Sequence, residues 1–351
     1  MIKVLYGVCG EGLGHAIRSK ILIDYLKEKN FDVRVVAGGK AYSLLAKDYS
    51  HVTEIETAKF VFKDNKTRLF NTAFKTLYRT ILFGLPSLLK VRRIIKNFKP
   101  DIIITDADPV SHIGARINKI KRISIDNPHA LLFRKYKLDQ GEFISWFLLI
   151  FALKITMFGA DKYIIYDYFD EQIKDPKVLF IKPLIQKGVL EQKPIIGDYV
   201  FVYQSLKEND LVCRVLKKID EKFIVYGYDK STVDENLTFK EFNQDEIFKD
   251  LSGAKAVITN GGFNVISEAL YLKKPIYSLP IKYQFEQVLN AKFVEKLGAG
   301  VYHSNLDEKN LKEFLSNLDY YRNKLMSYDP GKQDEKLKKI EEEIKLLTSK
   351  K

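Results

Sequence analysis

The segment from Ala256 to Glu268 combines an apolar run, two glycines and an acidic side chain in a spacing that suits a phosphate-containing ligand. Residues 256–259 (AVIT) have the composition of a buried strand, and residues 260–264 (NGGFN) follow it directly. A strand that turns through glycines into a helix leaves unpaired backbone N–H groups at the positive end of the helix dipole, which favours anions. Asn260, Gly261 and Gly262 are predicted to bind the diphosphate of a ligand, and Phe263 and Asn264 are predicted to belong to the same binding site.

Glu268 falls about two turns into the predicted helix, on the same side as its start. A carboxylate in that position can accept hydrogen bonds from ribose hydroxyls. The alternative interpretation is an ordinary strand, turn and helix of any doubly wound protein, with Glu268 on a solvated face. Four further residues follow downstream: Pro280, Glu286, Gln287 and Asn290.

This pattern resembles the GT-B nucleotide-sugar glycosyltransferases, in particular their MurG-like and UDP-glucuronosyltransferase-like branch. Those enzymes carry a pattern close to H-x-G-x-x-x-x-x-E, then a proline, an acidic-Gln pair and Asn-Ala. Asn260, Gly262 and Glu268 occupy the His, Gly and Glu positions of the pattern. Asn260 replaces the family's diphosphate-binding His or Ser, and an amide can donate a hydrogen bond but carries no charge.

The resemblance also implies roles for residues outside the glycine turn. Glu286 and Gln287 are expected to contact sugar hydroxyls, and Asn290-Ala291 completes the family pattern. The backbone near Phe242, at the end of a predicted strand, is expected to meet the nucleotide base. The donor is a nucleotide sugar, most simply a UDP-sugar, and neither a separate cofactor nor a metal is expected.

A second glycine-rich turn, residues 7–15 (GVCGEGLGH), follows the first predicted strand. A dinucleotide-binding site needs an acidic residue at the end of the next strand, whereas that strand ends in 36–39 (VAGG), which argues against NAD. By the resemblance, Gly12 and Gly14 belong to the nucleotide-sugar site and His15 is the general base. The alternative is that His15 only caps or packs at the start of a helix.

Asp106 ends another predicted strand, residues 102–105 (IIIT), and should lie near His15. A histidine that titrates near neutral pH can take a proton from an acceptor hydroxyl, and a paired carboxylate stabilises the imidazolium that forms. The resemblance implies this orienting role for Asp106, although an aspartate beside Asp108-Pro109 also suits a plain turn. Residues 126–129 (DNPH) form a second polar cluster that faces the acceptor or forms a turn.

Alternating strand and helix patterns predict parallel βαβ units in an α/β fold with two doubly wound, Rossmann-like domains. Ligands of such folds bind beyond the carboxyl ends of the strands, here in the interdomain cleft of a GT-B protein. The predicted strands are 2–8, 31–37, 102–105, 122–126, 162–166, 199–203, 222–226, 238–242, 256–259 and 275–279. The predicted parts are an acceptor-binding domain at 1–185, a nucleotide-sugar-binding domain at 186–330 and an amphipathic helix at 331–351, with a linker at 183–194.

A net charge of +13 on 351 residues favours an acidic partner: a nucleotide substrate, an anionic membrane or nucleic acid. Basic and aromatic side chains interleave over residues 59–99, and residues 144–158 form an apolar run shorter than the ~20 residues of a spanning helix. We therefore expect peripheral binding to an anionic bilayer, against the alternative of a solvated basic face. No recognised nucleic-acid module is present, so no nucleic acid is expected as a partner.

The sequence thus predicts a cytoplasmic glycosyltransferase, peripheral on the inner membrane face, since two distant cysteines suit a reducing compartment. It is expected to transfer a sugar from a UDP-sugar to an acceptor hydroxyl, with a lipid-linked acceptor as one option, by inversion and without a metal. The alternatives are a UDP-sugar 2-epimerase on the same fold, a non-catalytic nucleotide-sugar-binding protein and a membrane-surface scaffold.

Overall fold

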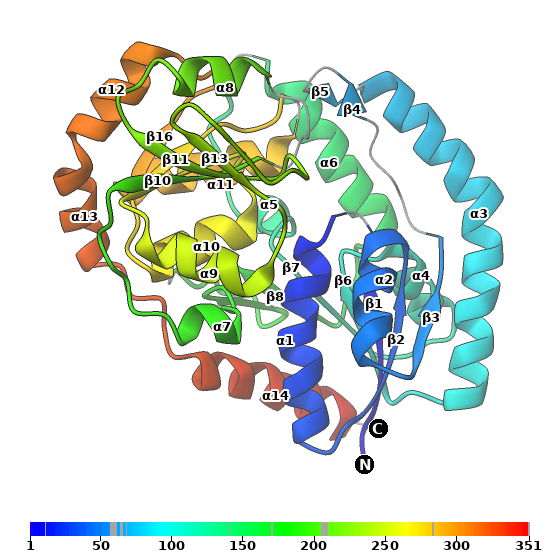
Figure 1. Ribbon diagram of the computed structural model, residues 1–351. Helices are drawn as coiled ribbons and strands as arrows, with labels where there is room; N and C mark the ends of the chain where they lie inside the picture. The colour runs from blue at the N-terminus through cyan, green and yellow to red at the C-terminus, as the bar shows by residue number, and fades with distance from the viewer. Residues whose placement is uncertain are drawn as a thin grey trace. The chain divides into compact units, whose positions relative to one another are not determined.

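In the computed structural model the chain forms two compact units, each built on its own parallel-dominated sheet (Figure 1). Unit 1 comprises Met1–Val61, Arg68–Leu184 and Gly331–Lys351, and unit 2 comprises Phe62–Thr67 and Ile185–Pro330. The structure describes residues 1–10, 12–56, 62–63, 66–67, 69–139, 141–169, 171–204, 210–282 and 284–349, with side chains outside 62–83 and 210.

Unit 1 contains a seven-stranded sheet in the order β3-β2-β1-β6-β7-β8-β9, in which every neighbouring pair is parallel. Its central strands are buried along nearly their whole length, as expected where helices cover both faces of a parallel sheet. The strands are β1 (Lys3–Val8), β2 (Asp32–Ala37), β3 (Val52–Glu54), β6 (Ile102–Asp106), β7 (Arg122–Asp126), β8 (Lys162–Tyr166) and β9 (Val178–Ile181).

The helices of unit 1 alternate with these strands. Asp108 caps α4, because its carboxylate accepts from the backbone N–H groups of Val110 and Ser111 at 3.3 and 3.0 Å. The helices are α1 (Gly14–Glu28), α2 (Gly39–Asp48), α3 (Leu69–Phe98), α4 (Pro109–Ile117), α5 (Ala130–Phe133), α6 (Phe143–Thr156) and α14 (Gln333–Ser349).

The C-terminal helix α14 belongs to unit 1 by its contacts. It buries Leu337, Ile340 and Ile344, which lie on one helical stripe. Its Glu341 accepts a hydrogen bond from the Tyr25 hydroxyl of α1 at 2.6 Å. The last helix of the chain is therefore tied to the first.

Unit 2 contains a second seven-stranded sheet, in the order β12-β13-β11-β10-β14-β15-β16, parallel except for the antiparallel pair β12–β13. Its strands are β10 (Tyr199–Tyr203), β11 (Lys222–Tyr226), β12 (Thr232–Asp234), β13 (Leu237–Lys240), β14 (Ala256–Thr259), β15 (Ile276–Ser278) and β16 (Gly300–Tyr302). The core of this unit includes Val200, Val202, Phe223, Val225 and Ile258.

The helices of unit 2 connect its strands, and a short antiparallel pair, β4 (Phe62–Lys63) and β5 (Lys66–Thr67), is grouped with this unit. The helices are α7 (Lys187–Leu190), α8 (Asp210–Leu216), α9 (Gln244–Gly253), α10 (Phe263–Tyr271), α11 (Phe285–Lys296), α12 (Glu308–Ser316) and α13 (Leu318–Met326).

The structure confirms the predicted α/β class. Five strands begin and end at the residues predicted from the sequence: β7, β8, β10, β11 and β14. The predicted strand over residues 238–242 is wrong at both ends. It begins one residue earlier, at Leu237, and stops at Lys240, so Phe242 lies beyond it. The reason is the next helix: Asn243 caps α9 and requires the chain to leave the sheet first.

Candidate active site

A buried polar network lies at the carboxyl ends of the central strands of unit 1. Asp106 is the last residue of β6, and three side chains from the first turns of α1 converge on its carboxylate. His15 Nδ1 is 2.8 Å from Oδ1, and the Ser19 hydroxyl donates to Oδ2 at 3.0 Å. Arg18 donates to Oδ1 from Nη2 at 2.5 Å and to Oδ2 from Nε at 3.1 Å.

The protonation of the His15 ring is coupled to these neighbours. Nδ1 lies 2.8 Å from Oδ1 of Asp106 and 2.9 Å from Nη2 of Arg18. It can donate to the carboxylate or accept from the guanidinium, but not both at once. Because a carboxylate is the stronger acceptor, we assign the tautomer in which Nδ1–H donates to Asp106. That tautomer carries its lone pair on Nε2, the nitrogen that a general base uses.

Asp106 stays ionised in this network. Its burial favours the neutral acid, but the charge of Arg18, the charge that His15 carries when it is protonated, and the hydrogen bonds from both outweigh that effect and lower the pKa of Asp106 to about 2. Arg18 is itself buried, and desolvation by itself would lower its pKa. The charge of the Asp106 carboxylate and the hydrogen bonds to it act in the opposite direction, and the pKa of Arg18 is raised overall. The two charges therefore form a permanent buried ion pair, of the kind that stays stable only when both partners are present.

The predicted second cluster joins the same network. Arg18 Nη1 donates to Oδ1 of Asn127 at 3.1 Å. Asp126 is 2.7 Å from Nδ1 of its neighbour His129, and both side chains are buried. Residues 126–129 thus support the site from inside unit 1 and, being buried, do not present a surface to an acceptor.

The structure divides the residues predicted for the nucleotide sugar between the two units. Gly12 has a φ of +72°, which favours glycine, and Gly14 begins α1. Both lie in unit 1 beside His15, whereas the predicted residues from Phe242 to Gln287 lie in unit 2. The pairing of His15 with Asp106 is observed within unit 1.

The glycine turn of unit 2 has a defined backbone requirement. Gly261 has a φ of +82°, and a Cβ built on it would lie 2.7 Å from the carbonyl oxygen of Gln287. Asn290 of α11 donates from Nδ2 to the Gly261 carbonyl at 3.0 Å. Gly262 is the N-cap of α10, has no side chain to cap the helix, and a Cβ on it would meet nothing within 4 Å. The turn therefore places two glycines, which have no side chains, directly before α10, and a helix N-terminus that follows glycines suits a phosphate.

Asn260 uses its amide donors inside the protein. Its Nδ2 donates to Oε1 of Gln204 at 2.8 Å and to the carbonyl of Leu279 at 3.2 Å. An amide nitrogen carries two hydrogens, so a direct bond from Asn260 to a phosphate requires one of these to break. In this structure Asn260 holds the glycine turn to the residues that directly follow β10 and β15.

Glu268 is buried in α10 and its carboxylate is held by a neighbouring amide. Gln186 donates from Nε2 to Oε1 of Glu268 at 2.7 Å, and Gln244 donates in turn to Oε1 of Gln186 at 2.8 Å. Burial raises the pKa of Glu268 to about 7, and the bond from Gln186 only partly offsets this. The alternative interpretation, in which Glu268 lies on a solvated face, is thereby excluded, since the residue is buried.

The acidic-Gln pair lies in the first turn of α11. Gln287 accepts from the backbone N–H of Ile281 through Oε1 at 2.9 Å, and this bond fixes the loop before the helix. Glu286 is half-buried in the same turn. Both residues lie next to the glycine turn, because Gln287 contributes the carbonyl that Gly261 approaches.

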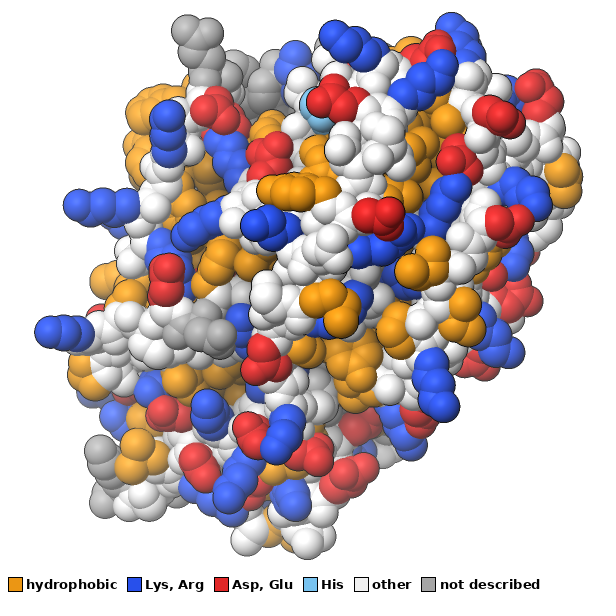
Figure 2. All heavy atoms as spheres, turned by 90° about the vertical axis from the view of Figure 1, so that its left-hand side faces the viewer, with side chains coloured by type: hydrophobic (Ala, Val, Ile, Leu, Met, Phe, Trp, Pro, Cys, Tyr) orange, Lys and Arg blue, Asp and Glu red, His pale blue; other side chains and the backbone are white. Residues whose placement is uncertain are grey.

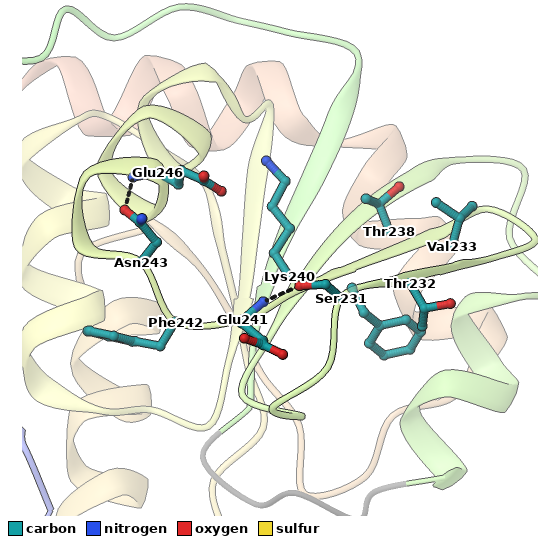
Figure 3. Close-up of a pocket in the computed structure, with 10 residues that line it drawn as sticks. Ser231, Thr232, Val233, Thr238, Lys240, Glu241, Phe242, Asn243 and Glu246 are labelled. Atoms are coloured by element: carbon teal, nitrogen blue, oxygen red, sulfur yellow. Dashed lines mark hydrogen bonds between the residues drawn. The ribbon is translucent and has the colours of Figure 1, made fainter.

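Phe242 lines a pocket of about 550 Å³ formed by β12, β13 and the start of α9. In Figure 3 the Phe242 ring and Asn243 lie at one end of this pocket and Thr232 and Val233 at the other, with the Lys240 side chain between them. The Phe242 residue is 54% exposed. An exposed aromatic ring at the edge of a pocket suits a planar base.

Residues 2–319 match the protein family described as glycosyl transferase family 1. The chain belongs to this family. It is a glycosyltransferase, as the sequence predicts.

Related proteins cover nearly all of this glycosyltransferase. An uncharacterized glycosyltransferase of Methanosarcina acetivorans is 26% identical over 85% of each chain. A protein of Clostridium botulinum, named as the UDP-N-acetylglucosamine–N-acetylmuramyl-(pentapeptide) pyrophosphoryl-undecaprenol N-acetylglucosamine transferase, is 26% identical over 97% of this chain and 98% of its own.

Solved structures establish the fold of the enzyme as GT-B. The spinosyn forosaminyltransferase SpnP superposes with a TM-score of 0.68 at 14% identity, covering 99% of this chain and 100% of its own. MurG of Acinetobacter baumannii superposes with a TM-score of 0.61 at 15% identity, covering 97% and 99%. The predicted GT-B architecture is therefore confirmed.

Sequence reasoning missed Arg18, Ser19 and Gln186. The first two were open to prediction, because residues 15, 18 and 19 have the i, i+3, i+4 spacing that places side chains on one face of a helix. Gln186 had no comparable signal, since it meets Glu268 across 82 residues of sequence. Among the described residues, no group of three or more His, Cys, Asp or Glu side chains is arranged to hold a metal ion.

Proposed function

We propose that this glycosyltransferase moves a sugar from a UDP-sugar to an acceptor hydroxyl, with inversion at the anomeric carbon and without a metal ion. The observation that carries the proposal is the start of α10 directly after Gly261 and Gly262, with Glu268 buried in the same helix. A helix start of this kind stabilises the negative charge that develops on a diphosphate leaving group. Glu268 would hold the ribose, and the backbone near Phe242 would meet the base.

Unit 1 would activate the acceptor. In the proposed step, Nε2 of His15 takes the proton of the acceptor hydroxyl as its oxygen bonds to the anomeric carbon. The bond from that carbon to the diphosphate breaks, and its electron pair leaves on the phosphate oxygen. Asp106, 2.8 Å from Nδ1, orients the ring and stabilises the imidazolium. A single displacement from the opposite side inverts the anomeric centre.

A lipid-linked acceptor is proposed from two findings. The Clostridium botulinum relative is named for a pyrophosphoryl-undecaprenol acceptor. In addition, α6 exposes an apolar face, here called the α6 face, formed by Phe143, Ile144, Phe147, Phe151 and Ile155. Each of these five residues is between 49% and 59% exposed, and such a face suits the interfacial zone of a bilayer. None of the described helices is both long enough and apolar enough to cross a membrane.

Incubation with a panel of labelled nucleotide sugars and anionic lipid acceptors tests the proposal. Release of UDP together with a glycosylated lipid supports it, and the anomeric coupling constant of the product by NMR reports inversion. Conversion of the UDP-sugar into an epimer would instead identify a 2-epimerase. Binding of the nucleotide sugar without turnover of any acceptor would identify a binding protein and overturn the proposed reaction.

A further inference from the structure

The carboxylate proposed to orient the general base is shared between two cationic partners. His15, Arg18 and Ser19 occupy one face of α1, and all three contact Asp106. Arg18 is 3% exposed and bonds to both oxygens of the carboxylate, while His15 reaches only Oδ1. The guanidinium is thus closer to Asp106 than the His15 ring is, and it binds both carboxylate oxygens whereas the ring contacts one.

The guanidinium changes what His15 experiences. A carboxylate alone at 2.8 Å would strongly favour a protonated imidazole. Here the charge of Arg18 already compensates that carboxylate, and Nη2 of Arg18 lies 2.9 Å from Nδ1 of His15. Protonation of His15 would therefore set two cations against one anion at short range.

The other groups around this cluster do not cancel the effect. Burial raises the pKa of Tyr6 on β1 and of Tyr166 on β8, so both are neutral, and the Tyr166 ring lies 4.9 Å from the Arg18 guanidinium carbon. Asp126 on β7 lies 2.7 Å from His129, and its charge acts on Arg18, whose pKa it helps to raise, so it too favours the charged guanidinium. Within the part of the chain that the structure describes, Arg18 and Asp106 are permanently charged side chains in direct contact with the His15 ring.

We propose that Arg18 is a positioning residue that keeps His15 in its neutral, proton-accepting form by neutralising the carboxylate that the two side chains share. The inference rests on the proposed role of His15 as the general base. It assigns Arg18 no contact with substrate: the residue acts through Asp106. The consequence is a base that works at lower pH than an isolated histidine–carboxylate pair would.

The test measures the titration of His15 by NMR in the full-length protein without substrate. The chain has five histidines, and comparison with a His15→Gln variant identifies the signal of His15. Arg18→Gln removes the charge and keeps a hydrogen-bond donor, so we expect the midpoint of the His15 titration to rise by about one to three pH units. Arg18→Lys is the matched control, because it keeps the charge and should leave the midpoint near that of the unaltered protein.

A second pair of variants covers the case in which Arg18→Gln does not fold. Asp106→Asn leaves the Arg18 charge in place, whereas Arg18→Met combined with Asp106→Asn leaves neither charge in the interior. The midpoint should be about one to three pH units higher in the double variant than in Asp106→Asn. The inference is overturned if the His15 midpoint is the same in Arg18→Gln as in the unaltered protein. It is also overturned if the midpoint is the same in Asp106→Asn as in the double variant.

Turnover separates this inference from the proposed function. If His15 is the base, the acidic limb of the kcat/KM profile should move to higher pH in Arg18→Gln by the same amount as the NMR midpoint. If the midpoint moves while a His15→Ala enzyme retains normal turnover, Arg18 controls the charge of His15 but His15 is not the base. If the midpoint stays fixed while His15→Ala abolishes turnover, the proposed function stands and the role of Arg18 is refuted.

Discussion

Among single residues, Glu268 gives the most direct test of the donor site. Glu268→Ala should weaken UDP binding about ten- to a hundredfold, because hydrogen bonds to a charged group contribute ~1.5–3 kcal/mol. Isothermal calorimetry measures the change, and Glu313→Ala, an exposed carboxylate on α12 of the same unit, is the control. Unchanged UDP affinity in a folded Glu268→Ala protein would show that Glu268 does not bind the ribose.

The buried state of Glu268 also predicts a pH-dependent stability. Its pKa rises from 4.5 to about 7 on folding. Below pH 4.5 both states are protonated, but between that pH and about 7 only the unfolded chain releases the proton, so rising pH favours unfolding. Relative to Glu268→Gln, the unaltered protein should lose about 3 kcal/mol of unfolding free energy between pH 4 and pH 8. Urea melts across this range measure the difference, and parallel curves for the two proteins would contradict it.

His15 should affect turnover far more than donor binding. Loss of a general base typically costs ~10²–10⁴-fold in rate, and His15→Ala should show this in kcat with UDP affinity nearly unchanged. Asp106→Asn should show a smaller loss in the same direction, because it keeps a hydrogen-bonding partner for the ring. A His15→Ala enzyme with near-normal kcat on its acceptor would rule out the assigned role.

At the level of an element, the two glycines before α10 form a matched pair. Gly261→Ala forces a φ of +82° on an alanine and brings its Cβ 2.7 Å from the Gln287 carbonyl, so it should destabilise the protein by ~1–3 kcal/mol. Gly262→Ala has room for its Cβ and an ordinary φ of −63°, so its melting temperature should not change. It should instead weaken UDP binding, because the new methyl group occupies the helix start. Thermal melts and calorimetry on both variants decide between a structural and a binding role for each glycine.

The elements themselves were predictable where local pattern and tertiary role agree. β8, β10, β11 and β14 are short runs rich in β-branched and aromatic residues inside a sheet, and β7 (RISID) keeps two isoleucines between polar residues, so burial within the sheet gives each a sequence signal. The edge strands β3, β9, β12 and β16 are only three or four residues long and were not predicted. Such strands exist because a neighbour offers free backbone groups, which the sequence alone does not display.

The site was predictable to a similar degree. Asp106 and His15 each follow a strand or begin a helix, so topology alone brings them together. By contrast, the sequence does not reveal that both donors of Asn260 are used within unit 2, or that Gln186 holds Glu268, because each depends on partners distant in sequence. The predicted contact of Asn260 with phosphate remains a prediction that requires one of its bonds to exchange.

For the whole molecule, the positions of the basic side chains matter more than the net charge of +13. Figure 2 shows a face, turned from the side of Figure 1 where α12 and α13 lie, on which basic, acidic and apolar side chains are interspersed. In unit 1, α3 exposes Leu85 and Leu89 and, further along, Arg92, Arg93 and Lys96. The predicted basic and aromatic side chains between residues 59 and 83, including Lys63, Lys66, Arg68, Lys75 and Arg79, lie outside the described side chains.

Binding to membranes should therefore combine an apolar contribution from the α6 face with an electrostatic contribution from α3. Each Lys or Arg near an anionic surface adds about 1 kcal/mol, and this attraction fades over a Debye length of ~8 Å at physiological salt. We expect co-sedimentation with anionic vesicles, little with neutral ones, and partial release at high salt. Phe147→Glu combined with Phe151→Glu should reduce the binding that survives high salt, since both rings are about half exposed.

Reversal of the basic residues isolates the electrostatic part. Arg92→Glu, Arg93→Glu and Lys96→Glu together should abolish the salt-sensitive binding to anionic vesicles. UDP affinity should be unchanged, because these residues belong to unit 1 and the proposed donor site to unit 2. Lys309→Glu with Lys312→Glu, on α12 of unit 2, changes the net charge in the same direction and is the control for a general charge effect. Two outcomes would contradict a specific basic surface on α3. One is that this control lowers vesicle binding as much per charge as the α3 variant does, and the other is that the unaltered protein binds neutral and anionic vesicles equally. In either case a soluble acceptor becomes the better hypothesis.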